Sequence, residues 1–130
     1  MSGSIPSEIG LLSNLETISL SGNAIAGEIP SEIGELSSLK FLSLSENKLT
    51  GKIPEVIFDL ALESLDLSEN EISGSLDEGL QKMTSLEILK LSSNKFSGPI
   101  PPEFGALTKL GEYEKYNSIF RHVVNTGHFC

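Results

Sequence analysis

Few side chains in this sequence are of the types that carry out chemistry. His122, His128 and Cys130 are the only soft metal ligands, and their spacing, H-x5-H-x-C, lacks the fourth ligand and the paired short spacings of a structural zinc site. Serines are common, but no histidine precedes His122 to activate one as a nucleophile. Glycine motifs that bind phosphates or dinucleotides are absent. The sequence therefore predicts no catalytic site, no metal and no cofactor.

A period of 23 or 24 residues organises the chain instead. Leucines begin successive units at steps of 24, 23, 24 and 24 residues: Leu15, Leu39, Leu62, Leu86 and Leu110. In each unit two more aliphatic side chains alternate with polar ones, which is typical of a short strand with one buried face. These pairs are Ile18/Leu20, Leu42/Leu44, Leu65/Leu67 and Leu89/Leu91. A unit can bury them only against a neighbouring copy, so we predict a stacked solenoid.

An asparagine follows each aliphatic pair at the same steps: Asn23, Asn47, Asn70 and Asn94. The strand must bend here, and a side-chain amide can bond the backbone groups that the bend leaves unpaired. We therefore predict a structural ladder of asparagines with no role in ligand binding. The glycine four residues further on, at positions 27, 51, 74 and 98, suits a positive φ angle.

The repeated pattern L-x-x-L-x-L-x-x-N-x-L resembles that of leucine-rich repeat proteins. The second half of each unit resembles the plant-type subclass, as in I-A-G-E-I-P-S-E-I-G-E-L (residues 25–36) and L-T-G-K-I-P-E-V-I-F-D-L (residues 49–60). The next copy departs from this pattern, with Leu76-Asp77 in place of Ile-Pro. The resemblance covers Ile5 to about Leu110. It implies an α/β solenoid, a right-handed arc with a parallel β-sheet on its concave face and a helical turn on its convex side.

The positions of the repeats divide the chain into three parts. Residues 1–14 are a partial N-terminal repeat, residues 15–109 are four complete repeats (15–38, 39–61, 62–85 and 86–109), and residues 110–130 are a degenerate repeat start and a tail. The second repeat is one residue short at Leu60-Ala61-Leu62, in a connection where a deletion is tolerated. For the tail, a cap, a linker and foreign sequence remain open. Because the first residues are out of phase with a complete unit, we expect an excerpt of a longer protein.

Residues between the inward leucines should face outward from the sheet in columns, with about 4.8 Å between strands. We predict that two columns bind the ligand: Thr17, Phe41, Ser64 and Ile88, then Ser19, Ser43, Asp66 and Lys90. We expect a third column, Ser21, Ser45, Ser68 and Ser92, to face outward too. Phe41 and Ile88 are candidate anchors for a bound chain. The alternative is that they are scattered exposed apolar residues.

Charged residues extend these columns. Glu46 and Glu69 should be adjacent, with Asp66 nearby, in an acidic patch that could receive a Lys or Arg; the alternative is a solvated rim. The column after the asparagines reads Ala24, Lys48, Glu71 and Lys95, which predicts small exposed ion pairs between repeats.

Composition limits the partners. The chain has 18 acidic and 9 basic residues, a net charge of −9 and a pI near 4.6, which disfavours binding to nucleic acid or to anionic membranes. The acidity favours a basic peptide partner or simply solubility. The single cysteine excludes an internal disulfide, and the sequence contains neither cysteine caps nor a signal peptide. The compartment therefore stays open, although the resemblance implies an extracellular or cell-surface setting.

The resemblance implies a non-catalytic module that binds a protein or peptide through its concave face, as in the ectodomains of receptor-like kinases. A soluble inhibitor of a cell-wall-degrading hydrolase, like the polygalacturonase-inhibiting proteins, is the second hypothesis. Ice binding by ordered Ser and Thr columns is the third, and a purely structural stack is the fourth. Uncapped ends with unpaired strand edges also predict self-association.

Overall fold

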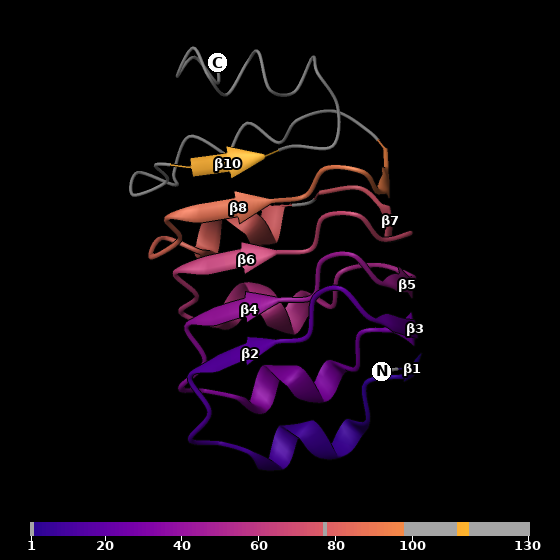
Figure 1. The fold of residues 1–130 in the computed structure, drawn as a ribbon. Helices are drawn as coiled ribbons and strands as arrows, with labels where there is room; N and C mark the ends of the chain where they lie inside the picture. The colour runs from indigo at the N-terminus through magenta and orange to yellow at the C-terminus, as the bar shows by residue number, and fades with distance from the viewer. Residues whose placement is uncertain (1, 77, 98–111, 115–130) are drawn as a thin grey trace, which may run out of the picture.

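The computed structural model describes residues 2–76, 78–97 and 112–114, and the fold is a stack of coils (Figure 1). Each coil contains a strand of one long sheet, a second short strand and a 3₁₀ helix. In chain order the elements are β1 (Ser2–Gly3), η1 (Ser7–Leu11), β2 (Thr17–Ser19), β3 (Ala24–Glu28), η2 (Ser31–Glu35), β4 (Phe41–Ser43), β5 (Lys48–Thr50), η3 (Glu55–Asp59), β6 (Ser64–Asp66), β7 (Ser73–Gly74), η4 (Glu78–Lys82), β8 (Ile88–Lys90), β9 (Lys95–Phe96) and β10 (Glu112–Glu114).

The long sheet has five parallel strands in the order β10-β8-β6-β4-β2. Its register aligns equivalent residues of successive repeats, so that Phe41 lies beside Ser64 and Ser64 beside Ile88. Each strand of this sheet has three residues. The fifth strand, β10, pairs with β8 and continues the register at the degenerate repeat start.

The leucines and isoleucines of the repeat pattern form one continuous core. Leu42, Leu65 and Leu89 point inward from the strands and are at most 1% exposed. The next leucines along the chain, Leu44, Leu67 and Leu91, are equally buried. Burying one such side chain contributes roughly 1.5–3 kcal/mol. The prediction of a leucine-rich repeat solenoid with a parallel sheet is confirmed.

Proline positions the 3₁₀ helices behind the sheet. Pro6, Pro30 and Pro54 each adopt an extended conformation directly before a helix, with φ between −75° and −60°. Their carbonyl groups accept the first helical hydrogen bond, as in Ile33 N–H to Pro30 O at 3.1 Å. The helices are short because a 3₁₀ turn is seldom longer than a few residues. Among the described residues, the helical turns that the resemblance implied are all of this 3₁₀ type.

Glycine lets neighbouring helices come close together. A Cβ atom at Gly34 in η2 would lie 2.5 Å from Cβ of Val56 in η3, and one at Gly10 in η1 would lie 2.8 Å from the Glu32 carbonyl oxygen. Both distances are shorter than a Cβ atom normally keeps from a non-bonded heavy atom. Phe58 takes the equivalent position in η3, where its side chain is buried.

The short strands form two smaller parallel sheets, β1-β3-β5 and β7-β9, along one side of the long sheet (Figure 1). Gly27, Gly51 and Gly74 lie in or beside these strands with φ of 83°, 77° and 93°. These positive angles are those that the glycine positions predicted, and the equivalent Gly98 lies outside the described residues.

The connection from each helix back to the long sheet is a turn, except in the second repeat. Leu39 N–H donates to Leu36 O at 3.0 Å, and Leu15 N–H to Leu12 O and Leu86 N–H to Met83 O are the equivalent bonds of two other connections. In the shorter repeat Leu60 is extended, with ψ of 146° against 71° at Leu36. Ala61 alone then leads to Leu62. The deletion has therefore removed a surface turn while Leu60 and Leu62 stay buried.

Candidate functional site

The asparagines that follow the long-sheet strands connect successive repeats. Asn70 Nδ2 donates to the carbonyl oxygens of Leu67 and Ser68 in its own repeat, at 3.2 Å each, and to Leu44 O of the preceding repeat at 2.9 Å. Its Oδ1 accepts from Leu49 N–H at 3.0 Å. Asn47 and Asn94 make the same set of bonds. These amides bond the backbone of two repeats, so they support the sheet rather than face a ligand.

The residue before each of these asparagines adopts a left-handed conformation. Glu46, Glu69 and Ser93 have φ of 55°, 55° and 57°, and Gly22 holds the equivalent position with φ of 70°. This conformation costs an L-residue roughly 1–2 kcal/mol, and the asparagine hydrogen bonds help to hold the bend. Sequence reasoning missed this turn, although the glycine at position 22 was a signal for it.

The first predicted column crosses the sheet in register. Thr17 and Phe41 are exposed, and Phe41 keeps 43% of its surface accessible. Ser64 and Ile88 are half-buried. Phe41 is thus a large apolar side chain in solvent, as expected. Ile88 lies on the same face of the sheet as Phe41, but its side chain is less exposed than we expected for an anchor of a bound chain.

The second predicted column contains Ser19, Ser43, Asp66 and Lys90, aligned by the same register. The Asp66 carboxylate accepts hydrogen bonds from Ser68 N–H at 3.0 Å and from Ser68 Oγ–H at 2.6 Å. These bonds orient the carboxylate on the sheet face beside Lys90. The sheet therefore presents Asp66 in a defined position.

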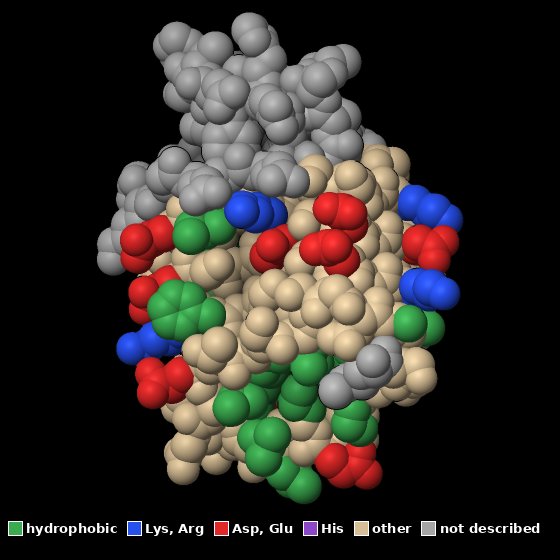
Figure 2. All heavy atoms as spheres, viewed as in Figure 1, with side chains coloured by type: hydrophobic (Ala, Val, Ile, Leu, Met, Phe, Trp, Pro, Cys, Tyr) green, Lys and Arg blue, Asp and Glu red, His purple; other side chains and the backbone are tan. Residues whose placement is uncertain are grey.

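Acidic side chains gather over the middle of this face (Figure 2). Glu46 and Glu69 are both exposed and follow neighbouring strands, joined by a hydrogen bond from Asn47 N–H to Glu69 O at 3.2 Å. With Asp66 they form what we call the acidic patch. Its members lie close together, as the sequence indicated.

The third predicted column was placed wrongly in part. Ser45 and Ser68 are only 7% exposed, so the middle of the serine column is buried instead of facing solvent. The chain has already left the flat part of the sheet at these positions, because the strands end at Ser43 and Asp66. A flat outward array of serines, as ice binding would need, is therefore not present in these repeats.

Exposed ion pairs join successive repeats on both sides of the sheet face. Lys95 Nζ lies 3.2 Å from Glu71 Oε1, in the column that predicted such pairs, and Lys40 Nζ lies 3.7 Å from Glu16 Oε1. All four side chains are about half exposed or more. Such pairs contribute about 0–1 kcal/mol each.

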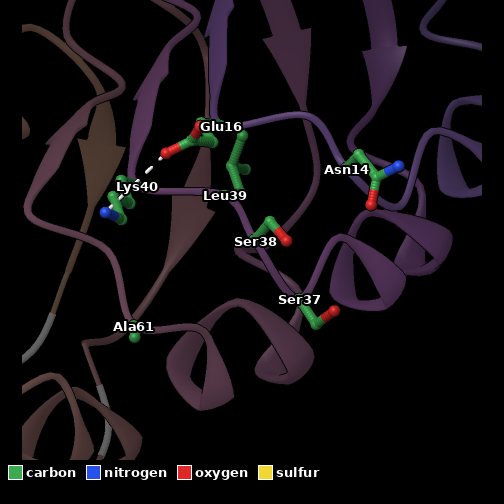
Figure 3. A pocket seen from close by; sticks show the side chains of 7 residues that line it. All are labelled: Asn14, Glu16, Ser37, Ser38, Leu39, Lys40 and Ala61. Atoms are coloured by element: carbon green, nitrogen blue, oxygen red, sulfur yellow. Dashed lines mark ion pairs between the residues drawn. The ribbon is translucent and has the colours of Figure 1, made fainter.

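A shallow hollow of about 410 Å³ lies beside the connections that lead into β2, β4 and β6 (Figure 3). Asn14, Glu16, Ser37, Ser38, Leu39, Lys40 and Ala61 line it. The Glu16–Lys40 ion pair spans one wall, and the hollow includes Ala61 of the connection that has lost its turn. Its charged groups already pair with each other, so they offer little to a ligand.

In the part of the chain that the structure describes, no group of three His, Cys, Asp or Glu residues is placed to hold a metal ion. His122, His128 and Cys130 lie outside these residues. No described helix is long and apolar enough to cross a membrane.

Comparisons with known proteins agree with the repeat pattern. A family model described as Leucine Rich Repeat matches residues 14–36 and 38–60, and a second, described as Leucine Rich repeats (2 copies), matches residues 61–110. A search of curated proteins found no match.

Several solved structures of plant receptors are similar to this chain. The ectodomain of the Arabidopsis receptor kinase HAESA, solved with an N-terminally extended IDA peptide hormone, shares 36% identity and a TM-score of 0.83 over 89% of this chain and 20% of its own. The ectodomain of the Arabidopsis thaliana receptor kinase GASSHO1/SCHENGEN3, solved with CASPARIAN STRIP INTEGRITY FACTOR 2, shares 40% identity and a TM-score of 0.82 over 89% of this chain and 14% of its own.

A chain of the BIR3–SERK2 complex from Arabidopsis thaliana shares 34% identity and a TM-score of 0.73, and here the match covers 90% of this chain and 69% of the relative. The chain thus spans less than a quarter of the two longer receptor ectodomains and about two thirds of this shorter one. Repeat pattern, hydrogen-bonded asparagines and these similarities agree: the chain belongs to the plant-type leucine-rich repeat family.

Proposed function

We propose that this chain is a non-catalytic recognition module that binds a protein or peptide through the solvent-facing side of its five-stranded sheet. The observation that carries the proposal is Phe41, a large apolar side chain that is 43% exposed at the start of β4, the strand next to the edge strand β2. Exposing a phenylalanine in water is unfavourable, and aromatic side chains are common anchors at interfaces. The inward residues are occupied in building the core, so the outward ones are available for contact.

The relatives support this assignment. The HAESA ectodomain was solved with a peptide hormone, and its fold is shared with this chain at a TM-score of 0.83. A parallel sheet supported by a packed core presents its side chains in fixed positions, which lowers the entropy cost of binding. The second and third hypotheses, hydrolase inhibition and ice binding, have no comparable observation in their favour.

A peptide-display selection tests the proposal. A random peptide library is selected on the wild-type chain, and the binding of selected peptides is measured by fluorescence anisotropy. Because truncation of an aromatic anchor costs about 1–2 kcal/mol or more, we expect the variant Phe41→Ala/Ile88→Ala to bind about tenfold more weakly.

Leu11→Ala is the matched control, since Leu11 is an equally apolar side chain, 78% exposed, in a helix away from the sheet face. It should bind the selected peptides as the wild type does. Selected peptides that bind all three proteins equally would show that the sheet face is not the recognition surface.

A further inference from the structure

The register places the small Ser64 between the larger Phe41 and Ile88 on the sheet face, and we call the position above Ser64 the notch. Ser64 lies between them in register, on the intervening strand β6. Two strand spacings separate the outer residues by about 10 Å, and the serine is too small to fill the space between two large side chains. The notch has the width of one aliphatic or aromatic side chain.

Acidic side chains lie on both sides of this notch, as Figure 2 shows for the whole face. Glu63 and Glu87 directly precede β6 and β8, while the acidic patch (Glu46, Asp66 and Glu69) lies toward the other ends of the strands. Within the described ranges, none of the four glutamates takes part in an ion pair. Lys90 and Lys40 are the cations beside the notch, and Lys40 pairs with Glu16, so the carboxylates around the notch outnumber the lysines.

We propose, building on the function proposed above, that the partner is an extended basic segment with one bulky apolar side chain flanked by Lys or Arg two positions away on each side. The apolar side chain occupies the notch. Alternate side chains of an extended peptide are about 6.6 Å apart, and so are Ser64 and Asp66 along β6. A segment that follows the strand direction therefore brings one basic side chain to Asp66 and Glu69, and the other to Glu63 and Glu87.

Charge complementarity is the reason for choosing this partner. An acidic segment would bring its carboxylates against five like charges, whereas a basic one is attracted from a distance and held in one register. Apolar contact in the notch and charge contact at its ends act on different groups of the partner, so they can be separated by experiment.

Three synthetic peptides of otherwise identical Gly/Ser sequence provide the probes. Their central segments are Lys-Ser-Leu-Ser-Lys, Glu-Ser-Leu-Ser-Glu and Lys-Ser-Ser-Ser-Lys, and their affinities are measured by fluorescence anisotropy at low and high salt. We expect the first to bind at least fivefold more tightly than the others, with an affinity that falls as salt rises. Ser64→Leu should remove the advantage of the central leucine because it fills the notch.

The charge contacts are tested with Glu63→Gln and Glu69→Gln, each of which should weaken binding of the first peptide by roughly two- to fivefold. Glu55→Gln makes the same change on η3, behind the sheet, and should leave affinity unchanged. Equal affinity for the three peptides would overturn the inference.

The two proposals fail in different ways. Library peptides that depend on Phe41 but carry no basic residues would contradict the basic partner and leave sheet-face recognition intact. If neither the library nor the synthetic peptides yield binding that Phe41→Ala/Ile88→Ala weakens, both proposals are wrong.

Discussion

At the scale of single residues, the repeated asparagines stabilise this fold by hydrogen-bonding to backbone groups inside the stack. The amide of Asn70 is only 8% exposed and bonds backbone groups of two repeats. Leucine burial alone would leave these backbone groups without partners at the bend. The ladder thus makes the buried side of each bend compatible with an apolar core.

Replacing Asn70 with alanine should therefore be costly. Leu49 N–H and Leu44 O would lose their bonds to this amide inside the stack, so we expect the free energy of unfolding to fall by roughly 1–3 kcal/mol. Urea denaturation followed by circular dichroism measures the change. Asn14→Ala, at an exposed position, is the control and should stay within about 0.5 kcal/mol of wild type. Equal unfolding midpoints for the two variants would contradict a structural ladder.

At the scale of elements, the spacing of the 3₁₀ helices depends on small residues. η2 and η3 approach closely because Gly34 lacks a side chain opposite Val56. On the other side of the coil the strands already stand at their hydrogen-bonding distance, so the helices have little freedom to move apart.

Gly34→Ala should destabilise the chain by roughly 1–3 kcal/mol, the usual cost of overpacking. Its new methyl group would overlap the Val56 side chain, at 2.5 Å between the Cβ atoms. Thermal unfolding of both single variants and of Gly34→Ala/Val56→Gly forms a double-mutant cycle. We expect the second change to recover part of the loss, while strictly additive effects would show that the two helices do not clash.

At the scale of the whole molecule, the chain is a row of repeats in which each coil packs on its neighbours. Such a row has two end faces, and at the N-terminal one Leu11 and Leu12 are 78% and 54% exposed. In the described residues β2 is also the edge strand of the long sheet. Exposed leucines beside an open strand edge favour association with another molecule.

We therefore expect the 130-residue chain to self-associate through this end. Sedimentation velocity over a range of concentrations should show a rising sedimentation coefficient for the wild type and a lower, constant one for Leu11→Glu/Leu12→Glu. Phe41→Glu is the control: it adds a charge at an exposed apolar position on the sheet face and should leave self-association in place. A wild-type chain that stays monomeric throughout the range would contradict the prediction.

The sequence by itself determined the periodic part of this protein. Because a leucine gains free energy only when it is buried, its return every 23 or 24 residues sets the coil, the inward direction of Leu44 and Leu67, and the side of the sheet on which Phe41 and Asp66 lie. Asn70 and its equivalents are equally readable, because a bend that exposes backbone groups inside a core needs a polar partner.

Only the tertiary structure decided which outward residues are exposed, because that depends on the neighbouring coils. Ser45 and Ser68 have the alternation of outward residues, yet they are buried, because the short strands end before them and the chain curves inward. The left-handed turn at Glu46 and Glu69 and the half-buried position of Ile88 also became known only from the structure. Spacing along a chain specifies which repeat position a residue occupies, but its exposure is set by the side chains of the coils above and below.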